Sequence, residues 1–221
     1  MPQPRIISIG DLHGCSTALA ALIDAIDLKP QDTLVVLGDF VDRGIDSKGV
    51  LDQLIELQSK CNLVPILGNH DEMMLHSRDG KSDFQFWLNC GGDTALDSYG
   101  STSKLNLIPS NHFRFLESCR SYYETETHIF VHANYKPDVP LDQLDDHTLH
   151  WLSLKNYVPP SRHCSGKTFV VGHTPQQPEV LDLGYLICID TNCCGGGWLT
   201  AMDVNTKQIW QVNEKGQQRS A

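Results

Sequence analysis

The sequence predicts an α/β protein with a β-α-β-α-β unit at its start and a second sheet formed later in the chain. Two observations favour this class. In the first seventy residues, three short apolar runs alternate with two segments whose apolar residues recur at helical spacing. After residue 127, further short apolar runs are separated by Gly or Asn, which is typical of hairpins and indicates a mostly antiparallel second sheet.

The first unit contains three expected strands and two expected helices. The strands are the apolar, β-branched runs RIISIG (5–10), TLVVL (33–37) and NLVPIL (62–67). Between them, residues 16–26 and 47–57 place Leu, Ile and Val on one helix face. Consecutive strands joined by such helices run parallel with right-handed crossovers.

Residues 72–127 are less periodic and predict a helical and loop insert, with amphipathic pieces at 84–88 and 113–118. Residues 136–165 are expected to form surface loops with a short helix. Later strands are expected at 128–134, 168–173, 185–190, 198–204 and 209–212. We expect a single domain over residues 1–212, followed by a flexible tail at 213–221.

Composition and charge exclude several classes of protein. The 221 residues are 40% hydrophobic, and the formal net charge of −10 argues against duplex nucleic acid as the main partner. No apolar stretch is long enough to span a bilayer, and the start of the chain does not resemble a secretory signal. The eight cysteines form no C-x-x-C pair, so we expect free thiols and a cytoplasmic protein. The oligomeric state stays open.

Polar side chains follow five of the expected strands, mostly behind a glycine. The motifs are GDLHG (10–14), GDFVDRG (38–44), GNHD (68–71), VHAN (131–134) and GHTP (172–175). Because ligands of α/β sheets collect at the carboxyl ends of the strands, we expect these side chains to form one site.

The residue types in these motifs favour a particular kind of metal site. A mixture of Asp, Asn and His suits first-row transition ions such as Mn, Fe or Zn, and six ligands are too many for one tetrahedral ion. Two ions about 3.5–4 Å apart can share one carboxylate. Asp39 follows the middle of the first three strands and is the expected bridge.

As a set, these motifs resemble the PPP-type metallophosphatases of the calcineurin-like metallophosphoesterase superfamily, especially the short bacterial and bacteriophage serine/threonine protein phosphatases. Symmetrical dinucleoside tetraphosphatases share the same motifs. The resemblance covers about residues 5–204, and FWLNCGG (86–92) resembles a further segment of the short bacterial enzymes. It implies the metallophosphoesterase fold, a β-sandwich of two mixed sheets flanked by helices.

The resemblance also implies a role for each strand-end residue. It assigns the first ion to Asp11 and His13, the bridge to Asp39, and the second ion to Asn69, His132 and His173. The remaining roles are phosphate binding by Arg43 beside Asn69 and His70, and general acid catalysis by His70 with Asp42 as its orienting partner. Manganese is the expected metal, with iron or zinc as alternatives.

Elementary chemistry agrees with these roles. Bound metal ions lower the pKa of water towards about 7, which would allow a hydroxide held between two ions to attack phosphorus directly. A planar guanidinium suits a bidentate grip on phosphate. A histidine with a pKa near about 6.5 can protonate the leaving oxygen if a carboxylate fixes its tautomer.

The sequence departs from the family at two places. The family has a second phosphate-binding Arg where this chain has HWLSLKN (150–156), so Lys155 or the later Arg162 is the expected substitute. GNHD also ends in Asp71 where Glu is commoner.

Residues outside the motifs are expected to have ordinary roles. His76, His112, His128, His147, His150 and His163 are expected at the surface or in loops, and the four tryptophans in packing. Residues 193–197 (CCGGG) resemble a hairpin loop that overhangs the family's active site, with a flexible turn as the alternative.

Three functions are compatible with the motifs. The leading hypothesis is a metal-dependent phosphatase acting on phosphoserine or phosphothreonine in proteins. The alternative is a symmetrical bis(5′-nucleosyl)-tetraphosphatase or related dinucleoside polyphosphate hydrolase, against which the missing Arg and the net charge of −10 count mildly. A pseudophosphatase that binds phosphorylated partners without turnover is disfavoured by the intact ligand set.

Overall fold

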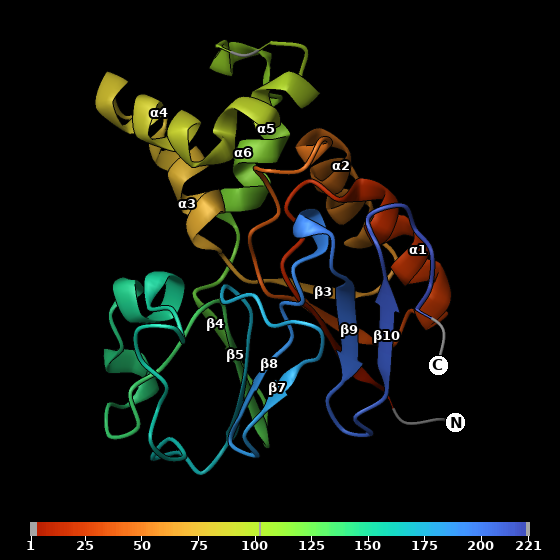
Figure 1. Cartoon of the computed structure of the whole chain (residues 1–221), viewed down its shortest axis with the longest axis vertical. Coiled ribbons are helices and arrows are strands. Elements are labelled where there is room, and N and C mark those ends of the chain that lie inside the picture. The colour runs from red at the N-terminus through yellow and green to blue at the C-terminus, as the bar shows by residue number, and fades with distance from the viewer. Residues whose placement is uncertain (1–3, 102, 220–221) are drawn as a thin grey trace.

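The computed structural model describes residues 4–101 and 103–219, which form two five-stranded sheets with helices beside and above them (Figure 1). The first sheet has the order β10-β9-β1-β2-β3. Its strands are β1 (Ile6–Ile9), β2 (Thr33–Val36), β3 (Asn62–Pro65), β9 (Leu199–Asp203) and β10 (Ile209–Val212). The first three run parallel, as expected, while β9 pairs antiparallel with both β1 and β10.

Two helices connect the parallel strands at the predicted positions. They are α1 (Ser16–Ile26) and α2 (Ser47–Leu57), and each buries the apolar face that its sequence period predicts. Asp46 caps α2 by accepting a hydrogen bond from the Gly49 amide at 2.9 Å.

The second sheet has the order β4-β5-β6-β8-β7. Its strands are β4 (Tyr122–Glu124), β5 (His128–Val131), β6 (Thr168–Val171), β7 (Leu181–Asp182) and β8 (Leu186–Cys188). The expectation of a mostly antiparallel sheet was wrong, because β5, β6 and β8 run parallel and only the two edge strands are antiparallel. The runs expected at 198–204 and 209–212 join the first sheet instead, so both sheets are mixed.

Alternation along the strands explains how the sheets pack. On β2, Leu34 and Val36 face the core shared with the helices, whereas Val35 faces a core that includes Phe130 and Val170 of the second sheet. The outer face of the second sheet is covered by the 135–154 segment, through Tyr135, Leu144, Leu149 and Leu154. Successive side chains of a strand thus alternate between two buried faces, as the period of two in a strand requires. The two sheets therefore pack face to face in the predicted sandwich.

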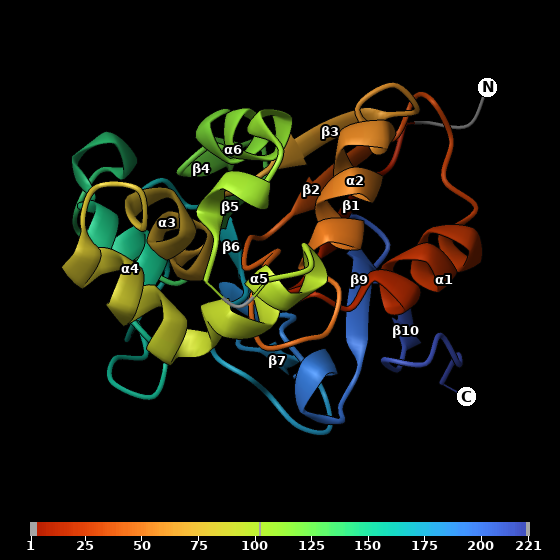
Figure 2. The ribbon, with the colours of Figure 1, turned by 90° about the horizontal axis from the view of Figure 1, so that it is seen from above.

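The insert between β3 and β4 consists of four α-helices and two short helical turns among the described residues. The helices are α3 (Asn69–His76), α4 (Lys81–Trp87), α5 (Asp93–Ser98) and α6 (Ser110–Glu117), and the turns are Leu88–Gly92 and Leu105–Leu107. Helix α3 begins inside the GNHD motif, so the helical region starts earlier than the expected residue 72. Figure 1 shows these helices standing at one end of the two sheets, and Figure 2 looks down from that end.

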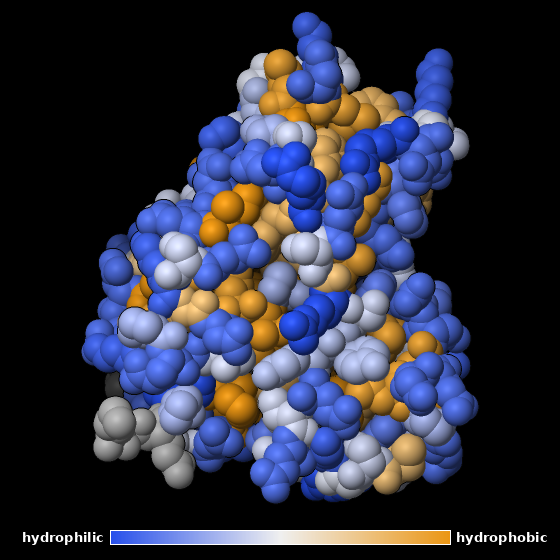
Figure 3. All heavy atoms as spheres, turned by 180° about the vertical axis from the view of Figure 1, so that it is seen from behind, coloured by the Kyte–Doolittle hydropathy of each residue, from blue (hydrophilic) through white to orange (hydrophobic). Residues whose placement is uncertain are grey.

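In the described ranges, three further short helical turns lie outside the insert, at Leu141–Gln143, His147–Trp151 and Cys193–Gly195. Residues 213–219, expected as part of a flexible tail, turn back against β10, where Arg219 bonds Gln211 and Glu179. Among the described residues, no helix has the length and apolar character to cross a membrane. Hydrophilic side chains cover most of the face shown in Figure 3, with hydrophobic ones between them.

The expectation that six histidines lie at the surface or in loops was wrong for His112, His128 and His150, which are buried within helical or strand segments. His163 is buried in a loop, while His76 and His147 are exposed. His112 is bound on both sides, by the Tyr99 hydroxyl at 2.7 Å and by Asp52 at 3.0 Å. Hydrogen-bond partners of this kind allow an imidazole to be buried, and the sequence pattern around it does not reveal them.

Candidate metal centre

The residues proposed for the second ion form one cluster that joins the two sheets. Asn69 opens α3 after β3, whereas His132 and His173 follow β5 and β6. The Asn69 Oδ1 lies 3.0 Å from His132 Nε2 and 2.9 Å from His173 Nδ1, and these two nitrogens are 3.1 Å apart. Three strand-end motifs that are distant in sequence therefore place nitrogen and oxygen atoms around one point.

The tautomers of the two histidines show why this cluster suits a cation. His132 Nδ1 donates to the Leu37 carbonyl at 2.7 Å, and His173 Nε2 donates to the Trp151 carbonyl at 3.1 Å. In the neutral rings, the opposite nitrogens therefore carry lone pairs. These lone pairs and the Asn69 oxygen converge, and acceptors cannot bond one another, so the donor set fits a metal ion.

Asp39 lies between this cluster and His13. Its Oδ1 is 3.4 Å from His132 Nε2, and its Oδ2 is 3.4 Å from His13 Nε2. Since His13 Nδ1 donates to the Val41 carbonyl at 3.0 Å, its Nε2 also carries a lone pair in the neutral ring. One oxygen towards each histidine is the arrangement that a bridging carboxylate requires.

Burial and charge shape the ionisation of this cluster. Burial lowers the pKa of His13 to about 4 and that of His132 to about 3, so both rings are neutral and able to bind metal at pH 7. Burial alone would raise the pKa of Asp39, but the surrounding histidines together hold that pKa below its usual range. His13, His132 and Asp39 are thus in their metal-binding protonation states.

Asp11 has a different environment from the other candidate ligands. Both its carboxylate oxygens lie 3.0 Å from the backbone amide of His173, and it is outside the two groups of closely spaced ligand atoms. Burial raises its pKa well above the usual value, and the charges of Asp190 and Asp39 add to that effect. A nearby cation would relieve this repulsion, which fits the metal role expected for Asp11.

A second arrangement lies beside the ligands and suits proton transfer. His70 Nδ1 lies 2.7 Å from Asp42 Oδ2, and the indole nitrogen of Trp87 donates to the two oxygens of Asp42 at 2.9 and 3.1 Å. Burial raises the pKa of Asp42 to about 6, although the bonds from His70 and Trp87 oppose that rise. Asp42 therefore orients His70, and Trp87 holds Asp42.

Arg43 joins the two arrangements. Its Nη1 lies 2.9 Å from His13 Nε2, and its Nη2 lies 2.8 Å from His70 Nε2. The FWLNCGG segment holds the Arg43 backbone, whose amide donates to the Gly91 carbonyl at 3.3 Å. A β-carbon on Gly92 would lie 2.5 Å from the Trp87 ring, so a glycine there allows the close packing that places Trp87 against Asp42.

Backbone strain is concentrated at this centre. Eight non-glycine residues in the described ranges have a positive φ, and five of them are candidate site residues: His13, Asp39, Asp42, Arg43 and His173. Such conformations cost about 1–3 kcal/mol each and persist where the surrounding structure enforces them. Their concentration in the motif loops indicates that the loops are shaped for function rather than for stability alone.

Comparison with known proteins identifies the family. The family model for calcineurin-like phosphoesterases matches residues 4–203. The chain belongs to the calcineurin-like phosphoesterase family. It is 32% identical to the serine/threonine-protein phosphatase 1 of Salmonella typhimurium over 199 residues, which cover 87% of this chain and 88% of that protein.

Other relatives are named for a different substrate, a dinucleoside tetraphosphate. A symmetrical bis(5′-nucleosyl)-tetraphosphatase of Nitrosomonas europaea is 31% identical over 140 residues, covering 62% of this chain and 47% of that enzyme. A solved structure described provisionally as a diadenosine tetraphosphatase superposes with a TM-score of 0.73 at 25% identity, covering 96% of this chain and 95% of that one. A cold-active protein tyrosine phosphatase, at a TM-score of 0.66 and 18% identity, covers 99% of this chain and 80% of its own and shows the fold alone.

The two cations that were expected to replace a second phosphate-binding arginine in this phosphoesterase lie in different places. Arg162 is bound to Thr168 Oγ1 and the Gly184 carbonyl, each at 3.0 Å. Thr168 begins β6, so Arg162 lies at the opposite end of that strand from His173. Lys155 is exposed and follows Leu154, whose amide donates to Thr174 Oγ1 at 2.9 Å beside His173, so Lys155 is the nearer of the two expected substitutes.

Sequence reasoning missed several residues that support the phosphoesterase site. Asp190 follows β8 and is buried, which raises its pKa to about 6; its place at a strand end was a signal that could have identified it. Trp151, expected in packing, donates to Glu72 Oε2 at 2.6 Å while its carbonyl accepts from His173. Asp71, by contrast, had been singled out in the GNHD motif; it accepts from the amides of Phe40 and Gly68 at 2.9 and 3.0 Å and thereby supports two motif loops.

Proposed function

We propose that the protein is a metal-dependent serine/threonine phosphoprotein phosphatase of the calcineurin-like phosphoesterase family. The observation that carries phosphoester hydrolysis is the placement of Asp39 between two histidine groups, beside Arg43 and the Asp42–His70 pair. The preference for a phosphoprotein rests on similarity to a serine/threonine-protein phosphatase over 88% of that protein's length.

Two divalent ions fit the donor set, with manganese proposed first and iron or zinc as alternatives. Asp11, His13 and Asp39 would hold one ion, and Asp39, Asn69, His132 and His173 the other. When bound, the ions supply a water of lowered pKa and positive charge near the phosphoryl oxygens.

The chain's own residues supply the remaining chemistry. Arg43 donates to His13 Nε2, and that nitrogen has one lone pair, so metal binding by His13 frees one arm of Arg43 for the phosphate. Arg43 and Asn69 then orient the phosphoryl group. His70, held by Asp42 at Nδ1, acts in its doubly protonated form once Arg43 Nη2 has turned from Nε2 to the phosphate, and it gives the Nε2 proton to the leaving serine or threonine oxygen.

A dinucleoside polyphosphate is the second candidate substrate, and similarity along nearly the whole chain to a structure described provisionally as a diadenosine tetraphosphatase favours it. The hydrolytic chemistry would be the same, and only the leaving group would differ. A pseudophosphatase is a third and less favoured candidate, because the Asp42–His70 pair is assembled for proton transfer.

A substrate panel with Mn²⁺ tests the proposal. Phosphoserine and phosphothreonine peptides, a phosphotyrosine peptide and diadenosine tetraphosphate would be compared by kcat/KM. We expect the phosphoserine and phosphothreonine peptides to be preferred and chelation to abolish all turnover. A clear preference for the dinucleotide would overturn the substrate proposal, while activity that is insensitive to chelation would overturn the metal mechanism.

Metal binding also has a readout that is independent of turnover. At about a hundredfold excess over Kd, a ligand of the folded state stabilises it by about 2.7 kcal/mol, which corresponds to about 5–11 °C in Tm at this chain length. We expect Mn²⁺ to raise Tm by this order and His132→Ala to reduce the rise. We further propose a cytoplasmic location, since all eight cysteines are free thiols.

A further inference from the structure

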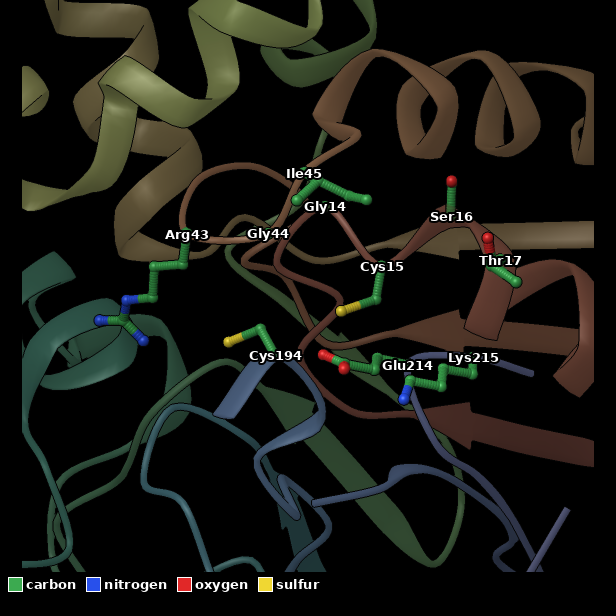
Figure 4. A pocket seen from close by; sticks show the side chains of 10 residues that line it. All are labelled: Gly14, Cys15, Ser16, Thr17, Arg43, Gly44, Ile45, Cys194, Glu214 and Lys215. Atoms are coloured by element: carbon green, nitrogen blue, oxygen red, sulfur yellow. The ribbon is translucent and has the colours of Figure 1, made fainter. Parts of the chain in front are cut away.

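A cavity of about 440 Å³ lies beside Arg43, on the side away from the insert helices (Figure 4). Cys15 and Cys194 line it, and Figure 4 shows Cys194 between Arg43 and Glu214, with Cys15 above Glu214. Ile45, Glu214 and Lys215 also line this cavity. Because Arg43 also contacts His13 and His70, the cavity adjoins the phosphate site directly.

The charges of this cavity do not suit additional phosphates. Arg43 directs its guanidinium at His13 and His70, so it serves the reacting phosphoryl group. The other two charged residues, Glu214 and Lys215, have opposite signs, and both are exposed. The cavity therefore offers no net positive charge for the remaining phosphates of a polyphosphate chain.

The rest of the wall is apolar or weakly polar. Cys15 and Cys194 present thiols, which pack as small hydrophobic groups. Ile45 is 90% exposed, the largest fraction among the large hydrophobic side chains in the described ranges. An isoleucine that packs against almost nothing in its own chain, at the rim of a cavity and two residues from Arg43, is placed for contact with a ligand.

We propose that this cavity binds an apolar side chain next to the phosphorylated serine or threonine of the substrate protein. The inference rests on the proposed phosphoprotein phosphatase function and adds a sequence preference to it. A peptide whose phosphate is held at Arg43 extends about 3.3–3.6 Å per residue, so a flanking side chain reaches the adjoining cavity within one or two residues. Leu, Ile, Met and Phe are the expected residue types.

Phosphothreonine peptides with alanine at every flanking position supply the basal activity. A single leucine is moved through the flanking positions, and a parallel series carries aspartate. We expect leucine at one position to raise kcat/KM about 10–100-fold, the range for burying one large apolar side chain. Ile45→Ser should reduce that preference to about threefold or less and leave hydrolysis of the alanine peptide unchanged.

The matched control is Ile209→Ser, which changes an isoleucine that is 42% exposed at the far end of β10 from residues 214–215. It should keep the leucine preference, and both variants should melt near the wild-type Tm. If all peptides are hydrolysed equally, or Ile45→Ser keeps the preference, the cavity assignment is wrong while the proposed function stands. If the enzyme instead prefers peptides with a flanking aspartate, and Lys215→Ala removes that preference, the assignment of the cavity to an apolar side chain is also wrong.

Failure of the proposed function gives a different pattern. An enzyme that hydrolyses diadenosine tetraphosphate but none of the phosphopeptides would overturn the phosphoprotein assignment, and the side-chain preference with it. The dinucleotide is therefore measured with the wild type and both isoleucine variants in the same series.

Discussion

Strands β1 and β2 carry a charged cluster at each end, and the two clusters differ in how their hydrogen bonds are satisfied. At the amino end, Arg5 donates from its backbone amide and Nε to Asp32 at 3.3 and 3.2 Å, and from its two Nη atoms to the carbonyls of Ile26 and Asp27 at 3.1 Å each. Donors meet acceptors, and the cluster is complete within the chain.

At the carboxyl end, acceptors face acceptors. The lone pairs of His132 and His173 and the Asn69 oxygen converge, and Asp11, Asp39 and Asp190 are buried near one another. These three buried carboxylates share the region with the guanidinium of Arg43, so a cation from outside the chain would offset the excess negative charge. The comparison teaches that satisfaction of hydrogen bonds, rather than the number of charges, separates a structural cluster from a functional one.

The largest effect is expected from His70→Asn, which removes the proposed acid from the carboxyl-end cluster. We expect kcat to fall roughly 10²–10⁴-fold, the range for losing a general acid. Metal content, measured by elemental analysis, should stay at two ions per chain. Because His70 also lies within ligand distance of His13 and Asp39, loss of one ion in this variant would make His70 a ligand instead.

Removal of the guanidinium comes next. Arg43→Ala should lower kcat/KM by about 10²–10³-fold, as for losing a preorganised charged donor in an active site. Arg43→Lys should recover part of the loss, because charge remains while the bidentate fork is absent. Lys155→Ala should cost less than about tenfold, since this exposed cation is screened by solvent. If Lys155→Ala lowers kcat/KM more than Arg43→Ala does, Lys155 is the principal phosphate contact.

Trp87→Phe tests a single hydrogen bond of the carboxyl-end cluster, because an aromatic ring is retained and only the donor to Asp42 is lost. We expect kcat to fall roughly tenfold, consistent with the loss of a bond to a charged group. The Trp87 bond lowers the pKa of Asp42, so its loss should raise that pKa. In a plot of kcat against pH, the ascending limb should then move to higher pH. If this limb does not move, Trp87 contributes only packing.

Arg5→Met breaks the amino-end cluster and should affect stability only. Although burial opposes it, the Arg5 guanidinium holds the pKa of Asp32 below its usual value. The pair therefore stabilises the fold above the unfolded pKa of about 3.9 and loses this effect as the pH falls through the folded pKa. We expect a loss of about 1–2 kcal/mol at pH 7 by urea denaturation, a smaller loss near pH 3, and unchanged kcat.

Local patterns in the sequence predicted the first part of the molecule well. Helices α1 and α2 have the predicted bounds because their apolar period and their flanking turns are local properties. The strand-end motifs predicted which side chains would meet, because parallel strands bring their carboxyl ends to one edge.

Non-local pairing could not be predicted in the same way. Nothing in the 198–212 segment distinguishes an antiparallel partner of β1 from a hairpin of the second sheet, since both need the same alternation. Trp87 was missed for a related reason, because its role depends on Asp42, a partner 45 residues away that folding brings into place. A buried indole in a helix has the same sequence pattern whether or not it holds a carboxylate.

The close packing of glycines around the centre has a consequence for anyone who wishes to redesign the enzyme. A β-carbon on Gly68 would lie 2.2 Å from the Asp39 amide nitrogen, and one on Gly172 would lie 2.1 Å from Asp11 Oδ1. Libraries that vary the motif loops would therefore consist largely of inactive clones. Diversity is better placed at Ile45, Cys194 and Lys215, where new selectivity can be screened without disturbing the reaction itself.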